Sequence, residues 1–257
     1  MKNQQLAETV KGWLLEAGEL IKQRMKNSLV VSTKSHRSDL VTNVDKEVQQ
    51  FLVERIEHFY SNDHILAEED GRNYLPNMDG RVWIIDPIDG TLNFVFQREN
   101  FAIMVGIYEE GIGQLGFLYD VVKEELYWGG VDIGVFCNDR KLLSPKNLGA
   151  KDGLWGMNGA IYAQNIGNVQ KIGKESMGVR IIGSAGIEFI SLLKGNTVGY
   201  ISNLYPWDYA AGMILVNEFG FKGSFLDGSQ IDFQSQEKFI VATDVAYGEV
   251  MKNVVNF

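Results

Sequence analysis

The sequence predicts a protein of mixed α and β structure, with an α+β half over residues 1–140 and an α/β half over residues 141–257. Two observations support this prediction. Helical periodicity followed by a series of short strands marks the first half, and alternating strands and helices mark the second. The chain has 257 residues, of which 45% are hydrophobic and 22% charged, so it can bury a sizeable core.

Two amphipathic helices are expected near the N-terminus. Hydrophobic residues recur at steps of three and four over residues 6–21 and again over residues 44–59. Thr42 or Asn43 can cap the second helix, because both side chains accept hydrogen bonds from free amides at a helix start. The polar stretch between the helices, residues 29–40, is expected to form a hairpin or an exposed loop.

Short strands joined by glycine-containing turns follow the second helix. Gly111 and the pair Gly129 and Gly130 mark two of these turns. The short connections predict a meander of antiparallel strands. The expected strands cover residues 65–67, 81–86, 101–108, 112–119, 124–128 and 134–136.

The pattern changes near Arg140, and strands alternate with helices after residue 179. This alternation is typical of an α/β arrangement. The expected helices cover residues 184–193 and 207–219. The expected strands cover residues 179–182 and 197–202 and lie near residues 221 and 239.

The most informative segment is the run WIIDPIDGT, which ends at Thr91. Its first residues are apolar on both strand faces, and Pro87 cannot continue a hydrogen-bonded ladder, so the strand should end at Asp86. Asp89 and Gly90 favour a turn, and Thr91 can cap a short helix that follows. A helix start offers free amides to a phosphate. Taken alone, the same residues fit a simple turn with a cap equally well.

Further carboxylates stand at Glu68, Glu69 and Asp208. Alone, the two glutamates fit a solvated strand end, and Asp208 fits a helix cap. Together with Asp86 and Asp89 they would repel one another, by about 4 kcal/mol for a unit pair 4 Å apart at an effective dielectric of 20. Such a cluster is sensible only with cations. Oxygen ligands beside a phosphate site favour Mg²⁺, and two such ions can activate a water and neutralise a leaving alkoxide.

Two other acidic motifs do not fit. Phosphatases of the haloacid dehalogenase type use Asp-x-Asp-Gly-Thr with the first Asp as nucleophile, but here Pro87 stands at that position. A calcium-binding EF-hand loop needs Asp at alternate positions, and Ile88 and Gly90 break that spacing. Neither a phosphoenzyme nor a calcium loop is therefore expected.

Composition excludes several partners. The net charge of −9 argues against nucleic acid, whose binding depends on Lys and Arg. No stretch approaches the roughly 20 apolar residues of a membrane span, and the N-terminus is amphipathic, so we expect a cytoplasmic protein. The lone cysteine, Cys137, cannot form an internal disulfide and is expected to be a packing residue.

Several segments together resemble the inositol monophosphatase family of Mg²⁺-dependent, lithium-sensitive phosphomonoesterases. They are residues 39–45 (DLVTNVD), 67–69 (AEE), 83–94 (WIIDPIDGTLNF) and 206–212 (PWDYAAG). The resemblance implies an alternating α/β/α/β/α layered sandwich and a homodimer. It also implies hydrolysis of a small phosphomonoester by direct attack of a metal-activated water.

The resemblance implies a binding site for two to three Mg²⁺ ions. By position, Glu68, Asp86 and the carbonyl of Ile88 would hold the first metal. Asp86, Asp89 and Asp208 would hold the second, and Glu68 could reach a third through water.

The resemblance likewise assigns water and phosphate contacts. Thr91, with Asp45, would orient the attacking water, so the implied catalytic residues are Thr91, Asp45, Glu68 and Asp89. The amides of Gly90 and Thr91 would hold the phosphate. Lys34 matches a lysine that lies near the phosphate in the family.

The segment Gly183, Ser184 and Ala185 matches the family segment that meets the organic part of the substrate. Many members that act on inositol phosphate also carry a Glu seven residues before the last metal-binding Asp, where this chain has Ile201. Asn203, together with Tyr200 and Tyr205, could contact substrate hydroxyls instead.

The expected substrate is therefore inositol monophosphate or a related polyol or sugar phosphate. A nucleotide phosphatase acting on NADP or a 3′-phosphoadenosine compound is the alternative within enzymes. A mainly non-catalytic binding protein is the alternative outside them, because a fold does not fix a function.

Overall fold

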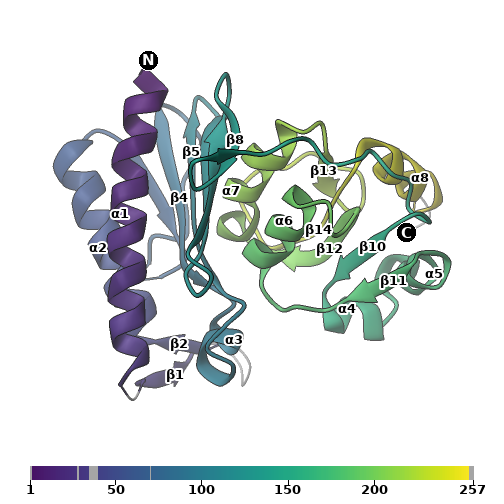
Figure 1. Ribbon diagram of the computed structural model, residues 1–257, viewed down its shortest axis with the longest axis horizontal. Helices are drawn as coiled ribbons and strands as arrows, with labels where there is room; N and C mark the ends of the chain where they lie inside the picture. Colours follow the sequence, from purple (N-terminus) through teal and green to yellow (C-terminus); the bar gives the residue numbers. More distant parts are fainter. Residues whose placement is uncertain (1, 28, 35–39, 70, 255–257) are drawn as a thin grey trace.

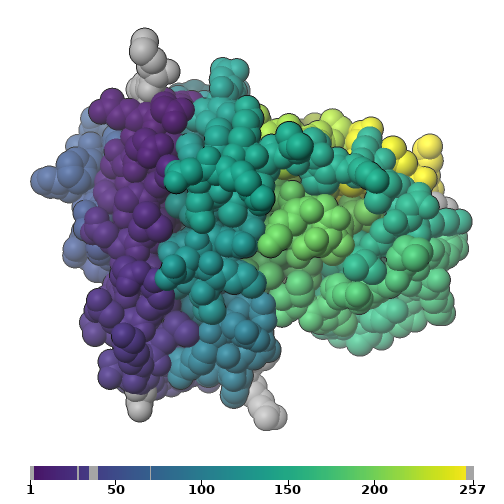
Figure 2. All heavy atoms as spheres, viewed as in Figure 1, coloured from purple at the N-terminus to yellow at the C-terminus, as the bar shows by residue number. Residues whose placement is uncertain are grey.

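The computed structural model describes residues 2–27, 29–34, 40–69 and 71–254. Its main helices and its two large sheets stack as alternating α/β/α/β/α layers (Figure 1). This arrangement confirms the predicted layered sandwich. The N-terminal and C-terminal halves pack side by side in the space-filling view (Figure 2).

The outer layer on the N-terminal side consists of α1 (Lys2–Met25) and α2 (Asn43–Phe59), as predicted. Thr42 is the N-cap of α2, and its hydroxyl oxygen accepts from the amides of Val44 at 3.1 Å and Asp45 at 3.4 Å. The cap fixes where α2 begins, and so places Asp45 in its first turn.

A two-stranded antiparallel sheet joins these helices. It consists of β1 (Val31–Thr33) and β2 (Leu40–Thr42), which agrees with the predicted hairpin. Residues 35–39 lie outside the described residues, and with them Asp39, the first residue of the family-like DLVTNVD segment.

The first large sheet contains seven strands in the order β3-β4-β5-β6-β7-β8-β9. All neighbours from β4 to β9 are antiparallel, as the predicted meander requires, but β3 and β4 are parallel. The expectation of a purely antiparallel sheet was therefore wrong, because the long connection over residues 68–80 returns the chain to the same end of the sheet. The strands are β3 (His64–Ala67), β4 (Arg81–Asp89), β5 (Ala102–Glu109), β6 (Ile112–Asp120), β7 (Glu125–Gly130), β8 (Gly134–Cys137) and β9 (Arg140–Lys141).

The second large sheet has the order β11-β10-β12-β14-β13. Its strands are β10 (Leu154–Met157), β11 (Gly178–Arg180), β12 (Gly199–Leu204), β13 (Lys222–Phe225) and β14 (Glu237–Ala242). The remaining helices are α3 (Thr91–Phe96), α4 (Gly159–Ala163), η1 (Ile166–Asn168), α5 (Val169–Glu175), α6 (Ala185–Leu193), α7 (Pro206–Asn217) and α8 (Asp244–Val254). Strands β9 and β10 and helices α4, η1, α5 and α8 were not predicted from the sequence. All but α8 are short, and glycines interrupt the apolar pattern of β10, α4, η1 and α5.

Helices α6 and α7 form the central layer, which packs against both large sheets (Figure 1). Alternation along β5 shows how the first sheet serves two cores. Ile103, Val105 and Ile107 face α1 and α2, whereas Ala102 and Met104 face α6 and α7. One helical layer thus packs against both sheets. The expected boundary between two domains at residue 140 stays a prediction.

The outer layer on the C-terminal side covers the other face of the second sheet with α4, α5 and α8 (Figure 1). Ile201 on β12 is fully buried in this layer, packed in a cluster that includes Trp155, Met157 and Ile161. The side chain therefore belongs to the core, and it cannot be read as a missing substrate contact. None of the described helices is long and apolar enough to span a bilayer.

We predict that Ile201→Glu destabilises the protein by about 3 kcal/mol or more, because it would bury an unpaired charge. The control Ile201→Val should cost only about 1 kcal/mol, since it removes one methylene group. Urea unfolding measures both. A Glu variant as stable as wild type would contradict the burial of this side chain.

Candidate active site

A break in the register of β4 brings two carboxylates together. Residues three apart in a regular strand point to opposite faces of the sheet. The pairing of β4 with β5 shifts between Asp86 and Asp89, at Pro87, which has no amide to donate. The amide of Ile88 instead donates to Asp86 Oδ1 at 3.0 Å. The irregularity thus allows Asp86 and Asp89 to approach the same point.

The third carboxylate comes from the start of α7. Asp208 stands in the first turn of this helix, and its Oδ2 accepts from the amide of Tyr205 at 2.8 Å. Oxygens of Asp86, Asp89 and Asp208 lie within 4.8 Å of one another. Asp208 can therefore serve both as a helix cap and as a metal ligand, because one of its oxygens accepts the capping hydrogen bond while the carboxylate stays in the cluster.

Glu68 lies beside this group and is paired with a lysine. Lys34 Nζ donates to Glu68 Oε1 at 2.8 Å and also forms an ion pair with Glu69. Gln49 fixes the glutamate segment by two hydrogen bonds to the backbone of Glu69, at 2.6 and 2.8 Å. Glu69 is buried rather than solvated, so the segment is not a simple exposed strand end.

Electrostatics makes the cluster costly without cations. Burial raises the pKa of Asp86 well above its usual range, and the charges of Glu68, Asp89 and Asp208 raise it further. Burial and the same kind of repulsion also raise the pKa of Asp208 well above normal. Groups that resist ionisation together, and that offer only oxygen donors, suit a hard divalent cation such as Mg²⁺.

Helix α6 begins against Asp89. Asp89 accepts hydrogen bonds from the amides of Ala185 at 3.0 Å and Gly186 at 2.8 Å, and also from the hydroxyl of Ser184. Burial raises the pKa of Asp89, but these donors oppose the shift. Ser184 and Ala185 therefore hold a cluster carboxylate in place. A contact between Gly183, Ser184 or Ala185 and a substrate stays a prediction.

The turn at Gly90 allows the start of α6 to lie close to the end of β4. Gly90 has φ of +88°, and a Cβ there would stand 2.9 Å from the Cβ of Ser184. It is the N-cap of α3, and Thr91 is the first helical residue. The expectation that Thr91 caps this helix was therefore wrong, because its side chain points to other partners.

The side chain of Thr91 instead contacts one residue of α2 and one at the end of β4. Thr91 Oγ1 lies 3.3 Å from Asp45 Oδ1 and 3.2 Å from the carbonyl oxygen of Ile88. Burial raises the pKa of Asp45 to about 6, although hydrogen bonds from Thr42 oppose the shift. The structure therefore brings Thr91, Asp45 and the Ile88 carbonyl together, and a role of Thr91 and Asp45 in orienting water stays a prediction.

Asn203 has no contact with the cluster among the hydrogen bonds of the described residues. It is exposed near the end of β12. A substrate contact through Asn203 therefore stays a prediction.

One buried carboxylate escaped the sequence analysis. Glu188 in α6 is only 1% exposed, and neither of its oxygens has a hydrogen-bond partner within the described part of the chain. Its carboxylate lies over Gly156 of β10, where an added Cβ would stand 2.2 Å from Oε2. A glutamate on the expected buried face of α6 was the available signal.

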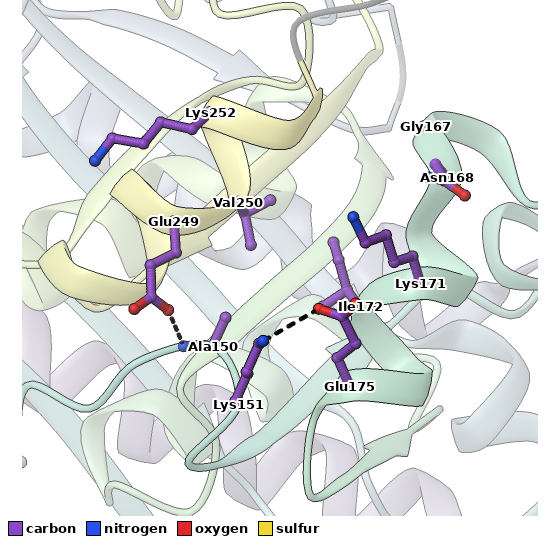
Figure 3. Close-up of a pocket in the computed structure, with 10 residues that line it drawn as sticks. All are labelled: Ala150, Lys151, Gly167, Asn168, Lys171, Ile172, Glu175, Glu249, Val250 and Lys252. Carbon is purple, nitrogen blue, oxygen red and sulfur yellow. Dashed lines mark hydrogen bonds and ion pairs between the residues drawn. The ribbon is translucent and has the colours of Figure 1, made fainter.

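A separate hollow of about 420 Å³ lies between α5 and α8 (Figure 3). Its charged lining is partly paired, with Lys151 and Glu175 at 3.8 Å and with Glu249 accepting from the amide of Ala150 at 2.7 Å. None of the predicted site residues lines it. The carboxylate cluster, rather than this hollow, is therefore the candidate active site.

Comparison with known proteins agrees with this geometry. The sequence model of the inositol monophosphatase family matches residues 2–256, so the chain belongs to this family. The inositol-1-monophosphatase of Bacillus subtilis is 40% identical over 234 residues, which cover 89% of this chain and 88% of the relative.

Solved structures extend the likeness to the fold. An IMPase/NADP phosphatase complexed with Mg²⁺ and phosphate has a TM-score of 0.91 at 32% identity, over 100% of this chain and 97% of its own. A staphylococcal inositol monophosphatase soaked with lithium chloride also has a TM-score of 0.91 at 32% identity, covering 99% and 95% of the two chains. The family resemblance drawn from the sequence is thus confirmed.

We predict that Glu188→Gln stabilises the protein at alkaline pH more than at acidic pH. Burial raises the pKa of Glu188 to about 8, against about 4.3 in an unfolded chain. Between these values the folded state binds more protons, so wild-type stability falls as pH rises through this window. The neutral amide avoids that loss, and the advantage of the variant should grow by about 2 kcal/mol or more from pH 5 to pH 9.

Urea unfolding of both proteins at the two pH values measures this difference. The exposed Glu54→Gln on α2 serves as the control, and its effect should be small and alike at both pH values. An advantage of Glu188→Gln that does not change with pH would count against a buried, proton-retaining carboxylate.

Proposed function

We propose that this protein is a Mg²⁺-dependent phosphomonoesterase that hydrolyses inositol monophosphate or a related polyol or sugar phosphate. The observation that supports this most is the approach of Asp86, Asp89 and Asp208 to within 4.8 Å beside a threonine paired with a buried aspartate. Membership of the inositol monophosphatase family agrees with the proposal. Phosphate release from inositol 1-phosphate, with and without Mg²⁺, tests it.

The donor set fits two to three Mg²⁺ ions. Glu68, Asp86 and the Ile88 carbonyl would hold one, and Asp89 and Asp208 would complete a second with Asp86. All of these ligands are oxygens, and burial, followed by repulsion between the charges, raises the pKa values of Glu68, Asp86 and Asp208. Mg²⁺ bound there would supply positive charge that acidifies a water and neutralises the leaving alkoxide.

Thr91 and Asp45 would orient the attacking water. Thr91 can donate its proton to Asp45, which leaves a lone pair on Oγ1 to accept a proton from water. A pKa of about 6 suits Asp45 to receive a proton near neutral pH. The water oxygen then bonds to phosphorus, the ester bond breaks, and the leaving oxygen takes a proton from water.

The phosphate would lie against the turn that follows β4. The amides of Gly90 and Thr91 would donate to it at the start of α3. Lys34 would add positive charge near the phosphate. Its ion pairs with Glu68 and Glu69 keep its side chain at the edge of the carboxylate cluster.

Other properties follow by analogy with the family. We expect inhibition by lithium, because a staphylococcal relative was captured in a lithium-soaked inhibitory complex. A homodimer in the cytoplasm also belongs to the proposal. A nucleotide phosphatase is the second candidate, supported by the likeness to an IMPase/NADP phosphatase. A purely binding role is less favoured, because a buried acidic cluster lowers the stability of the fold and a protein that only binds partners does not need one.

We predict that Asp208→Asn lowers turnover by about 100-fold or more and weakens the rise in melting temperature that Mg²⁺ causes in wild type. The amide oxygen can still accept from Tyr205, so the variant removes charge while it keeps the cap. Asp244→Asn, an exposed aspartate in the first turn of α8, is the matched control. Normal activity and a normal Mg²⁺ response in Asp208→Asn would refute the metal assignment.

We also predict that Thr91→Ala lowers kcat by about 10²–10⁴-fold with little change in the Mg²⁺ concentration needed for half-maximal activity. The hydroxyl is assigned to water and not to metal, so binding and turnover should separate. Thr91→Ser keeps the hydroxyl and should retain most activity. A large shift in Mg²⁺ requirement at unchanged saturated kcat would assign Thr91 to the metal instead.

A further inference from the structure

A loop residue with an unusual backbone conformation packs against the helix that carries Asp208. Phe233 lies in the connection between β13 and β14 and has φ of +60°. This left-handed conformation is a clear outlier for a bulky side chain. All other non-glycine residues with positive φ in the described chain are polar or charged. Such an outlier persists only where the surrounding contacts hold it in place.

Two buried tyrosines provide these contacts. The ring centroid of Phe233 lies 4.9 Å from that of Tyr108 on β5, with 69° between the planes. It lies 5.7 Å from that of Tyr209 on α7, with 43° between the planes. In the part of the chain that the structure describes, Phe233 is also the only partly buried hydrophobic residue that packs against two core clusters. One cluster lies in the central layer, and the other lies between α7 and strands β3–β5.

Both tyrosines contact the backbone that directly follows Asp208. Tyr209 is the next residue of α7, and it is fully buried. The hydroxyl of Tyr108 donates to the carbonyl oxygen of Ala210 at 2.9 Å. The ring of Phe233 therefore packs against the two side chains that tie the first turns of α7 to the core.

Asp208 depends on such support because its neighbours repel it. Its carboxylate lies within 4.8 Å of those of Asp86 and Asp89. The amide of Tyr205 donates to one of its oxygens at 2.8 Å, but like charges would still tend to push the start of α7 away from β4. Groups behind a metal ligand commonly hold it in place, and their loss typically weakens metal binding or activity by about 10–100-fold.

We propose that Phe233 is a positioning residue that holds the first turns of α7, and with them Asp208, in the arrangement that binds the second Mg²⁺. This inference rests on the metal site of the proposed function and extends it to a loop of the C-terminal half. The phenyl ring acts by packing alone, since it offers no atom that could bind metal or phosphate. The left-handed backbone at this position directs the ring toward the two tyrosines.

The test measures Mg²⁺ binding by calorimetry, without substrate, in wild type, Phe233→Ala and Phe233→Gly. Both variants lose the ring and should bind Mg²⁺ about tenfold more weakly. Only glycine relieves the left-handed backbone, so the unfolding equilibrium constant of Phe233→Gly should be about fivefold smaller than that of Phe233→Ala. Equal losses of Mg²⁺ affinity at different stabilities would separate positioning from a general loss of stability. Wild-type affinity in both variants, or an affinity that follows stability, would overturn the proposal.

Phosphate release from inositol 1-phosphate provides a second measurement. In Phe233→Ala the Mg²⁺ concentration needed for half-maximal release should rise by the same factor as the dissociation constant. The value of kcat at saturating Mg²⁺ should stay close to wild type, because the metal ligands and the water-orienting pair are unchanged. Phe233→Leu keeps an apolar side chain against the tyrosines and should recover most of the lost affinity. A leucine variant no better than alanine would contradict a role in packing.

Phe136→Ala provides the matched control. Phe136 on β8 is also partly buried, and its ring stacks on Trp128 at a centroid distance of 4.9 Å and 18°. It belongs to the core on the other face of the first sheet, together with α1 and α2. Its loss should lower stability and leave Mg²⁺ affinity unchanged. An equal loss of affinity in this control would indicate a general packing effect and overturn the proposal.

The outcomes separate this inference from the proposed function. If wild type binds Mg²⁺ but releases no phosphate from inositol 1-phosphate, the proposed activity fails, and calorimetry of the Phe233 variants still decides the inference. If wild type is active and the variants bind Mg²⁺ as it does, only the inference fails. A wild-type protein that binds no Mg²⁺ would overturn both.

Discussion

Repulsion between the carboxylates of Asp86, Asp89 and Asp208 is the constraint on which the rest of the site depends. Their oxygens lie within 4.8 Å, and burial together with mutual repulsion raises the pKa values of Asp86 and Asp208 well above normal. Separate backbone devices oppose this repulsion: the Ile88 amide on Asp86, the start of α6 on Asp89, and the Tyr205 amide on Asp208. Each of these donors lies where a strand or helix begins or ends, so the fold supplies them without extra side chains. These hydrogen bonds offset only part of the repulsion, and a bound divalent cation would neutralise the rest.

The layered architecture follows from the need to bring these segments together. The register shift in β4 places two carboxylates at one point, and α7, packed between both sheets, brings the third. Helix α6 lies in the same layer and closes on Asp89. Asp45 reaches the site from the outer layer, because the cap at Thr42 fixes it in the first turn of α2. The carboxylates therefore come from the end of β4 and the start of α7, and Asp45 comes from the outer layer.

Much of this arrangement could be predicted from the sequence, because strong local signals coincide with it. The amphipathic helices and the series of strands predicted the two halves of mixed structure, and the WIIDPIDGT run with the other acidic segments predicted the carboxylate cluster, whereas the layered sandwich came from the family resemblance. What failed depended on tertiary context. The strand β3 pairs in parallel because of a long connection, and Thr91 binds Asp45 and Ile88 instead of capping α3. The family resemblance aligned Ile201 with a substrate-contacting glutamate, whereas the strand β12 turns this side chain into the core. Glu188 could not be recognised as buried without a partner, since that depends on the space left by Gly156 on another strand.

The central claim is that this acidic cluster exists to bind divalent cations for phosphate ester hydrolysis. The most direct measurement follows the melting temperature of the metal-free wild-type protein during titration with Mg²⁺, alongside phosphate release from inositol 1-phosphate in the same samples. We expect both to rise over the same Mg²⁺ range, because cations that bind only the folded state stabilise it. An equal concentration of K⁺ should leave both unchanged. A melting temperature indifferent to Mg²⁺, together with full phosphate release in the presence of a chelator, would contradict the account.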